Sequence, residues 1–233
     1  MDILLYVLIG FFVLAIVIGL AVANFAGENL LTIYDRYSRQ NISFLNTIEF
    51  ANIVSTQEFN GKIKSRVIDG ILTDNYSNKV ISLSKNVAYG NNVSAFAVCA
   101  HELGHALQYR DTPKKMRRFS KTLVFCKIVS KLSLPIFLIG IPLIFWNIIY
   151  AVIIFGVGVL TFLIGLFAKL STIKIESEAS EKALELLSKY ADFDEDSVKQ
   201  AKKVLSAAKL TYVASFLKSV LSWTMLVRRY DFY

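Results

Sequence analysis

The sequence contains few cysteines, prolines, glycines and histidines. Its 233 residues include 2 Cys, 3 Pro, 11 Gly and 2 His. The count and spacing of Cys99 and Cys126 do not suggest a disulfide framework, which is typical of a reducing compartment. The scarcity of Pro and Gly excludes a collagen-like, linker-rich or low-complexity architecture. The chain therefore has to be held together by packing of its apolar residues, which make up 55% of it.

Charge is limited but unevenly signed. Charged residues make up 19% of the chain, and 26 Lys+Arg against 18 Asp+Glu give a net charge of +8. The apolar fraction exceeds what a soluble domain of this size needs, whereas the charged fraction is too high for a chain lying wholly in lipid. These two values predict a membrane protein with part of its chain in water.

The excess of positive charge does not indicate a nucleic-acid partner. A basic cluster, defined as Lys114, Lys115, Arg117, Arg118 and Lys121, precedes a long apolar stretch. Attraction to anionic lipid headgroups is sufficient to explain such a flank. The sequence has no aromatic-interleaved basic motif and no glycine-rich phosphate loop. The lipid bilayer is the predicted partner, and nucleic acid is not.

Two uncharged stretches predict membrane spans. Ile3–Ala23 is long enough for one helix to cross a hydrocarbon core of about 30 Å. Residues 21–23 resemble a signal-peptide cleavage site, but the run is too long and begins beside Asp2 rather than a basic residue. Leu132–Ala168 is nearly two spans long and predicts a helical hairpin that turns at Trp146-Asn147. Pro135 and Pro142 are expected to kink its first arm.

The distribution of basic residues predicts the orientation. Residues 24–122 carry 13 Lys+Arg and the segment from Lys169 onward carries 11, whereas residues 1–23 and 132–168 carry none. The positive-inside rule places the N-terminus outside and both basic segments in the cytoplasm of a bacterial-type plasma membrane. Lys209 and Lys218 interrupt the last apolar segment, Val204–Val227, which is expected to pack on the protein or lie at the interface.

The motif that carries chemistry is His101-Glu102-Leu103-Gly104-His105. It lies in a segment, Val93–Tyr109, with helical spacing of apolar residues. Residues i and i+4 of a helix lie one above the other, so both imidazoles can bind one Zn²⁺ with Glu102 beside them. These are the only two histidines of the chain. The pattern predicts a single zinc site rather than two core histidines.

A catalytic zinc needs a third protein ligand and an open position. Because no histidine is left, this ligand has to be a carboxylate or a thiolate, and Cys99 points off the ligand face of the helix. A helical projection of residues 169–190 puts Glu176 on the apolar face, and a lone buried carboxylate is costly unless it is paired or binds a metal. Glu176 is therefore the predicted third ligand, with an ion pair to a basic residue as the alternative.

Several segments together resemble a known family. They are GILTDNYSNKVISLS, VSAFAVCAHELGHALQYRD, IESEAS and KKVLSAAKLTYVASFL, placed around an N-terminal anchor and a membrane hairpin. The chain resembles the YugP-type family of membrane-bound neutral zinc metallopeptidases, distant relatives of the gluzincins that include the HtpX and CAAX prenyl proteases. The resemblance implies His101, His105 and Glu176 as zinc ligands and Glu102 as catalytic base.

The chain departs from the family pattern at two places. A His commonly stands at the position of Asn75 and Tyr-Asp-Pro at residues 76–78, where this chain has Tyr-Ser-Asn. The relatives' ExxxD pattern reads Glu176 to Ser180 here, so the carboxylate that would orient a ligand histidine is missing or comes from elsewhere.

These observations predict a mainly α membrane protein with a zincin-like cytoplasmic part that contains a small β-sheet. The expected divisions are an anchor (1–24), a zincin-like part (25–122), a transmembrane hairpin (123–168) and a helical part with the third ligand (169–233). The predicted activity is hydrolysis of peptide bonds in a peptide or protein substrate by metal-activated water, with one Zn²⁺ per chain. The oligomeric state is not predicted.

Substrate-binding residues are predicted less directly. Val67–Thr73 and Lys79–Ser84 have the composition of strands around a turn at Asp74–Asn78. An edge strand beside the catalytic helix can bind an extended peptide, and this assigns the edge to Gly70, Ile71, Leu72 and Thr73. An ordinary structural hairpin is the alternative. Tyr76 and Tyr212 are candidate donors to the oxyanion.

Three other functions fit the sequence less well. An intramembrane zinc protease would need its HExxH motif in a transmembrane helix, and Val93–Leu107 is too short for one. A noncatalytic zinc-binding scaffold or chaperone cofactor would need a closed site with a further His or Cys ligand. A transporter has little support in three spans without an internal repeat.

Asp192, Asp194 and Asp196 resemble the start of an EF-hand, but Ser197 replaces its glycine, so they predict a helix N-terminus.

Overall fold

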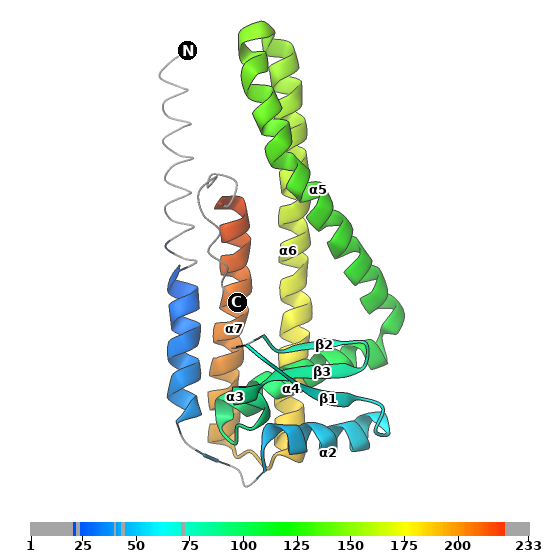
Figure 1. Ribbon diagram of the computed structural model, residues 1–233, viewed down its shortest axis with the longest axis vertical. Helices are drawn as coiled ribbons and strands as arrows, with labels where there is room; N and C mark the ends of the chain where they lie inside the picture. The colour runs from blue at the N-terminus through cyan, green and yellow to red at the C-terminus, as the bar shows by residue number, and fades with distance from the viewer. Residues whose placement is uncertain (1–20, 22–23, 40, 43–44, 71–72, 222–233) are drawn as a thin grey trace.

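The computed structural model describes residues 21, 24–39, 41–42, 45–70 and 73–221 (Figure 1). The predicted anchor Ile3–Ala23 lies outside these residues except for Ala21. The first described helix covers residues 24–38. Its Ala26 is fully buried against Leu210, and the carbonyl oxygen of Tyr34 accepts a hydrogen bond from Ser94 Oγ at 2.7 Å.

Helix α2 (Thr47–Phe59) covers one side of the core. Asn46 and Glu49 form a reciprocal capping box at its start, and Asn60 ends it in the left-handed conformation with φ 52°. Both features are local sequence signals for helix ends. The side chains of Phe50 and Val54 are fully buried.

A three-stranded sheet follows, formed by β1 (Lys64–Ile68), β2 (Asn75–Ser77) and β3 (Val80–Ser84). Its order is β1-β3-β2, with β1 parallel and β2 antiparallel to the central β3. Strand β2 is therefore an edge. Asn78 and Lys79, at φ 50° and 65°, make the tight turn between β2 and β3.

The small sheet was predicted, but the strand over Val67–Thr73 and the turn over Asp74–Asn78 were wrong. Strand β1 ends at Ile68 because the chain bends at Gly70, whose φ of 129° is open only to glycine. A Cβ on Gly70 would lie 2.5 Å from Thr73 Oγ1, so this bend is tight. The Asp74 carboxylate then accepts a hydrogen bond from the backbone N–H of Ser84 at 2.7 Å, and β2 begins where a turn was expected.

Helix α4 (Val93–Asp111) runs through the centre of the folded part, preceded by the short α3 (Lys85–Ala88). Asn92 caps α4 through a hydrogen bond to the N–H of Ala95. The core around α4 consists of fully buried large side chains from α2, the sheet, α4 and α6: Phe50, Ile81, Leu83, Phe96, Leu103 and Leu187. A helix surrounded in this way offers fixed positions for side chains on its remaining face.

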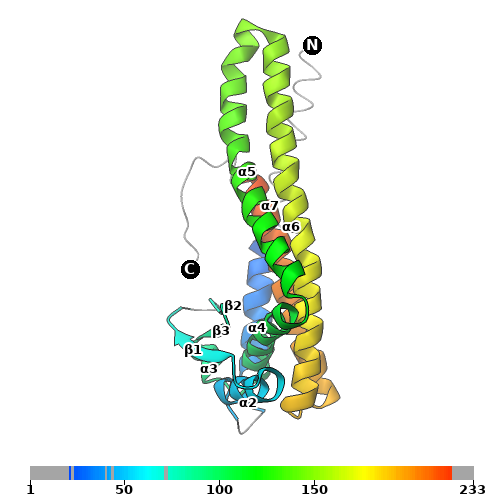
Figure 2. The ribbon, with the colours of Figure 1, turned by 90° about the vertical axis from the view of Figure 1, so that its right-hand side faces the viewer.

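Helices α5 (Pro113–Trp146) and α6 (Ile148–Tyr190) form the predicted hairpin, which extends away from the sheet (Figure 2). The turn lies at Trp146-Asn147 as predicted, because Asn147 leaves helical geometry and its side chain accepts hydrogen bonds from the N–H groups of Ile149 and Tyr150. Both helices are long and apolar enough to cross a membrane. They run without a break through the predicted divisions at residues 122 and 168.

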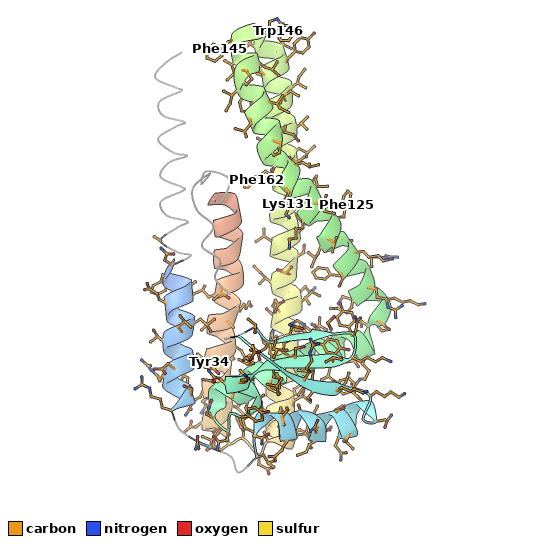
Figure 3. All side chains as sticks on the ribbon, viewed as in Figure 1. Tyr34, Phe125, Lys131, Phe145, Trp146 and Phe162 are labelled. Atoms are coloured by element: carbon orange, nitrogen blue, oxygen red, sulfur yellow. The ribbon has the colours of Figure 1, made fainter. Side chains whose placement is uncertain are left out.

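The hairpin exposes apolar side chains along its length (Figure 3). Phe145 and Trp146 at its tip are 89% and 83% exposed. Exposed apolar side chains gathered along two packed helices are typical of a surface that contacts lipid or another protein.

Helix α7 (Glu195–Leu221) packs along α6 and beside the first helix (Figure 1). Asp194 caps it by accepting a hydrogen bond from the N–H of Ser197 at 2.8 Å, which confirms the interpretation of the acidic segment as a helix N-terminus. The side chain of Tyr212 and the end of the predicted last segment, from residue 222, lie outside the described part.

Candidate metal centre

The centre forms where α4 and α6 cross. Gly104 makes the crossing close, since a Cβ at this position would lie 2.3 Å from the carbonyl oxygen of Ala179. His101 and His105 flank Gly104 on α4, and Glu176 lies one turn before Ala179 on α6. The glycine inside the HExxH motif therefore determines how near the carboxylate comes to the histidines.

Three side chains converge at the crossing. Glu176 Oε2 lies 3.1 Å from His101 Nε2 and 3.5 Å from His105 Nε2. One ligand atom from each residue lies within 4.8 Å of the other two, and within the described residues this is the one group with that property. The side chains are 14%, 18% and 12% exposed, so the group is sheltered but open to a ligand.

The other nitrogen of each imidazole has a partner. His105 Nδ1 lies 3.0 Å from Gln108 Oε1, and the Gln108 amide in turn donates to the carbonyl oxygen of Ile175 at 2.9 Å. His101 Nδ1 lies 3.3 Å from Ser180 Oγ, whose proton is donated to the carbonyl oxygen of Glu176. Both partners accept a hydrogen bond from the rings, so each Nδ1 keeps its proton, and a metal would take the place of the proton that each Nε2 directs at Glu176.

Electrostatics also favour a cation at this point. Glu176 lies beyond the uncharged stretch Leu132–Ala168. Burial by itself would raise the pKa of Glu176. Hydrogen bonds from His101 and His105 outweigh the effect of burial and lower this pKa to about 2. Burial would lower the pKa of His105, and the hydrogen bond and charge of Glu176 outweigh it and raise this pKa. Two imidazole nitrogens and one ionised carboxylate oxygen form a donor set that zinc accepts in open, catalytic sites.

Glu102 lies beside the ligands on α4. It is 8% exposed, and within the described residues it has no hydrogen bond or ion pair. Burial raises the pKa of its carboxyl group, the two histidines lower it, and the charges of Asp74 and Glu176 raise it further. An unpaired buried carboxylate next to a metal-ligand set is expected of a group that exchanges protons.

Gln108, Ser180 and Asp74 were not predicted as site residues. Gln108 is spaced three residues from His105 on one helix face, which was an available signal. Ser180 stands where the family pattern has a carboxylate. Its hydroxyl contacts the ring of His101, the ligand that such a carboxylate would orient. The charge of Asp74 raises the pKa of Glu102, and its position depends on the loop between β1 and β2, which no local sequence pattern specifies.

The predicted substrate-binding residues are only partly described. Gly70 and Thr73 lie in the bend after β1, outside any strand, and Ile71 and Leu72 lie outside the described residues. Tyr76 lies in β2, and its ring packs against that of Tyr109 on α4 at 5.7 Å between centroids. Among the described residues, β2 is an edge strand that contacts α4, and the assignment of substrate binding to Gly70–Thr73 stays a prediction.

The HExxH helix and a carboxylate from a later helix make up the donor set typical of metallopeptidases of the zincin class. Residues 11–230 match a family model described as "Putative neutral zinc metallopeptidase". The chain belongs to this family, which confirms the resemblance found in the sequence.

One curated relative supports the same family. "Putative membrane protease YugP" of Bacillus subtilis (strain 168) is 34% identical over 155 residues. The match covers 66% of this chain and 66% of the relative, slightly less than two thirds of its length. No solved structure matches the chain. The family name implies zinc, and the name of the relative implies a protease in a membrane.

Proposed function

We propose that this chain is a membrane-anchored, zinc-dependent endopeptidase that hydrolyses peptide bonds of peptides or proteins. The observation that carries the proposal is the convergence of His101, His105 and Glu176 beside the buried carboxylate of Glu102. The donor set includes no fourth His or Cys, and an open position is what distinguishes a catalytic zinc site from a structural one.

The roles of the residues follow from their atoms. His101 Nε2, His105 Nε2 and Glu176 would hold one Zn²⁺, and Ser180 and Gln108 keep the two rings in the required tautomer. When bound, the ion supplies Lewis acidity, which polarises a scissile carbonyl and lowers the pKa of water to about 7.

Glu102 is the proposed general base. Its carboxylate accepts a proton from the attacking water and passes it to the amine that leaves. Within the described residues Glu102 has no hydrogen-bond or ion-pair partner, so its carboxylate is free to accept this proton. The site then catalyses peptide hydrolysis without a covalent intermediate.

The hairpin is the proposed membrane-spanning part. Its exposed apolar surface would face lipid, with Trp146-Asn147 at the outer side and the metal centre in the cytoplasm. The metal centre itself lies outside the membrane in this arrangement, because α4 is buried among the other elements and is not one of the described helices able to span.

The test compares metal content with activity in detergent-purified protein. We expect about one zinc per chain in the wild type, a loss of zinc in Glu176→Ala, and retained zinc in Glu181→Ala, a matched change at an exposed position of α6. Glu102→Gln should keep zinc but lower casein cleavage at least about a hundredfold.

Two outcomes would contradict the proposal. Absence of zinc from the reconstituted wild type would exclude a zinc peptidase. Stoichiometric zinc with no effect of Glu102→Gln on any measured cleavage would favour the alternative, a noncatalytic zinc-binding scaffold or chaperone cofactor. Unchanged zinc in Glu176→Ala would refute only the assignment of the third ligand.

A further inference from the structure

A cavity that is separate from the metal centre lies between α5 and α6. Its volume is about 890 Å³, within the range of about 300–1,000 Å³ typical of ligand pockets. It forms because α5 slants away from α6 toward its N-terminus (Figure 1). None of His101, His105, Glu102 and Glu176 lines it.

The two helices meet at both ends of this cavity. Toward the hairpin tip they touch, since a Cβ on Gly165 would lie 2.3 Å from the Cβ of Ser130. At the other end, Lys115 of α5 pairs with Glu178 of α6 at 3.8 Å. The space between these contacts is therefore bounded at both ends by the packing of the two helices and is open along its side.

The lining changes from charged to apolar along the cavity. Lys114, Lys115 and Arg118 lie at the end nearest the start of α5. Further along α5 and on the facing part of α6, the lining is formed by apolar side chains, among them Phe119, Leu123, Leu163, Ile164 and Phe167. Within the described residues, no acidic residue lines the cavity and no carboxylate lies within 4.0 Å of the Lys114 or Arg118 side chain.

We propose that this cavity is a specific binding site for one anionic phospholipid. Guanidinium and ammonium groups at one end suit a phosphate, and the apolar remainder suits an acyl chain. The direction also fits, because the basic end adjoins the folded part and the apolar end leads toward the hairpin tip. The inference rests on the membrane-spanning part of the proposed function and does not depend on zinc or catalysis.

The test uses the full-length chain in a nonionic detergent, with native mass spectrometry counting bound lipid. We expect dioleoyl phosphatidylglycerol to bind at about one per chain and at least about tenfold more tightly than dioleoyl phosphatidylcholine. The double variant Lys114→Gln/Arg118→Gln should lose this preference. The matched double variant Arg117→Gln/Lys121→Gln removes the same charges from the same helix outside the cavity lining and should keep it.

Cys126 gives a second readout inside the cavity. Cys126 lines the cavity, whereas the other cysteine, Cys99, is fully buried in the core. The rate of thiol alkylation in the folded protein therefore reports on Cys126. Phosphatidylglycerol should slow alkylation of Cys126 several-fold more than phosphatidylcholine. Ala168→Phe, which fills the apolar part without changing charge, should abolish this protection while zinc content stays at the wild-type level.

The outcomes separate this proposal from its alternatives. Equal losses in the two double variants would overturn it in favour of diffuse attraction to a negative surface. Equal binding of the two lipids would reduce the cavity to an apolar groove, and displacement of the lipid by inorganic phosphate alone at millimolar concentration would show a simple anion site. Release of the chain from membranes by alkaline carbonate would instead refute the spanning hairpin, whatever the lipid result.

Discussion

The histidines of the metal centre are oriented by two neighbours of different chemistry. His105 has the amide oxygen of the buried Gln108, and His101 has the hydroxyl of Ser180. Partners of this kind fix the tautomer of a ligand, and their loss typically weakens metal binding by about 10- to 100-fold. The two positions can therefore be tested separately from the ligands.

Gln108→Leu should weaken zinc binding by about tenfold or more, because His105 Nδ1 loses its acceptor. Gln108→Glu keeps an acceptor for His105 but loses the donor to the Ile175 carbonyl oxygen, so it should bind zinc more tightly than Gln108→Leu while the metal-free protein unfolds at a lower temperature than the wild type. Competition with a chelating dye measures both, and thermal unfolding of the metal-free proteins separates this effect from a general loss of stability. Equal affinity in Gln108→Leu and the wild type would refute the orienting role.

Ser180 allows the converse experiment. Ser180→Ala removes the group 3.3 Å from His101 Nδ1 and should lower zinc affinity about tenfold. Ser180→Asp restores the carboxylate of the family pattern and should bind zinc at least as tightly as the wild type. If the Asp variant binds as weakly as the Ala variant, His101 is oriented by something else.

The residues of the metal centre that could be predicted from the sequence are those that local helix geometry places. His101, Glu102 and His105 share one helix, so spacing alone brought them together. Glu176 was predictable because an acid on an apolar helix face requires a partner. The contacts of Ser180 and the charge of Asp74 depend on how α4, α6 and the loop before β2 meet, and the linear sequence does not specify these approaches.

At the scale of elements, the crossing of α4 and α6 determines the metal centre. Gly104→Ala should destabilise the fold by about 1–3 kcal/mol and reduce zinc content, because the new methyl group would meet the Ala179 carbonyl oxygen at 2.3 Å and separate the helices. Zinc content and urea unfolding in detergent measure the two effects.

Gly156→Ala is the matched control, since a Cβ at this position of α6 has nothing within 4 Å. Alanine in a helix interior should leave zinc unchanged and alter stability by no more than about 1 kcal/mol. A Gly104→Ala protein with wild-type zinc and stability would show that the crossing can relax without cost.

The elements differ in how well their sequences specified them. The hairpin was predicted because apolar length and the Trp146-Asn147 turn are features of a continuous segment. The sheet was predicted with wrong bounds because β1 and β3 are parallel. Parallel strands cannot be joined by a tight turn, so no local turn motif marks where each of them ends. The bend at Gly70 and the hydrogen bond from Ser84 to Asp74 decide where β2 begins.

At the scale of the whole molecule, one carboxylate links three helices. Glu58 at the end of α2 accepts hydrogen bonds from Tyr190 and Lys189 of α6 and pairs with Arg110 of α4. These bonds, that from Tyr190 first, lower the pKa of Glu58 from 4.5 to about 2. The ionised form is therefore favoured by folding.

The sign of the resulting pH dependence follows from linkage. Because the pKa of Glu58 is lower in the folded protein, its contribution is fully present above about pH 4.5 and is lost as the pH falls toward 2. Glu58→Gln should lower the free energy of unfolding by about 1 kcal/mol at pH 7, a value reduced by screening because the Lys189 side chain is 63% exposed. The difference from the wild type should shrink between pH 5 and pH 3, as urea titrations at each pH would measure.

Glu185→Gln, an exposed change outside this network, is the control and should show no such pH dependence. If the difference for Glu58→Gln stays constant down to pH 3, the Glu58 side chain joins the helices by packing rather than by its charge.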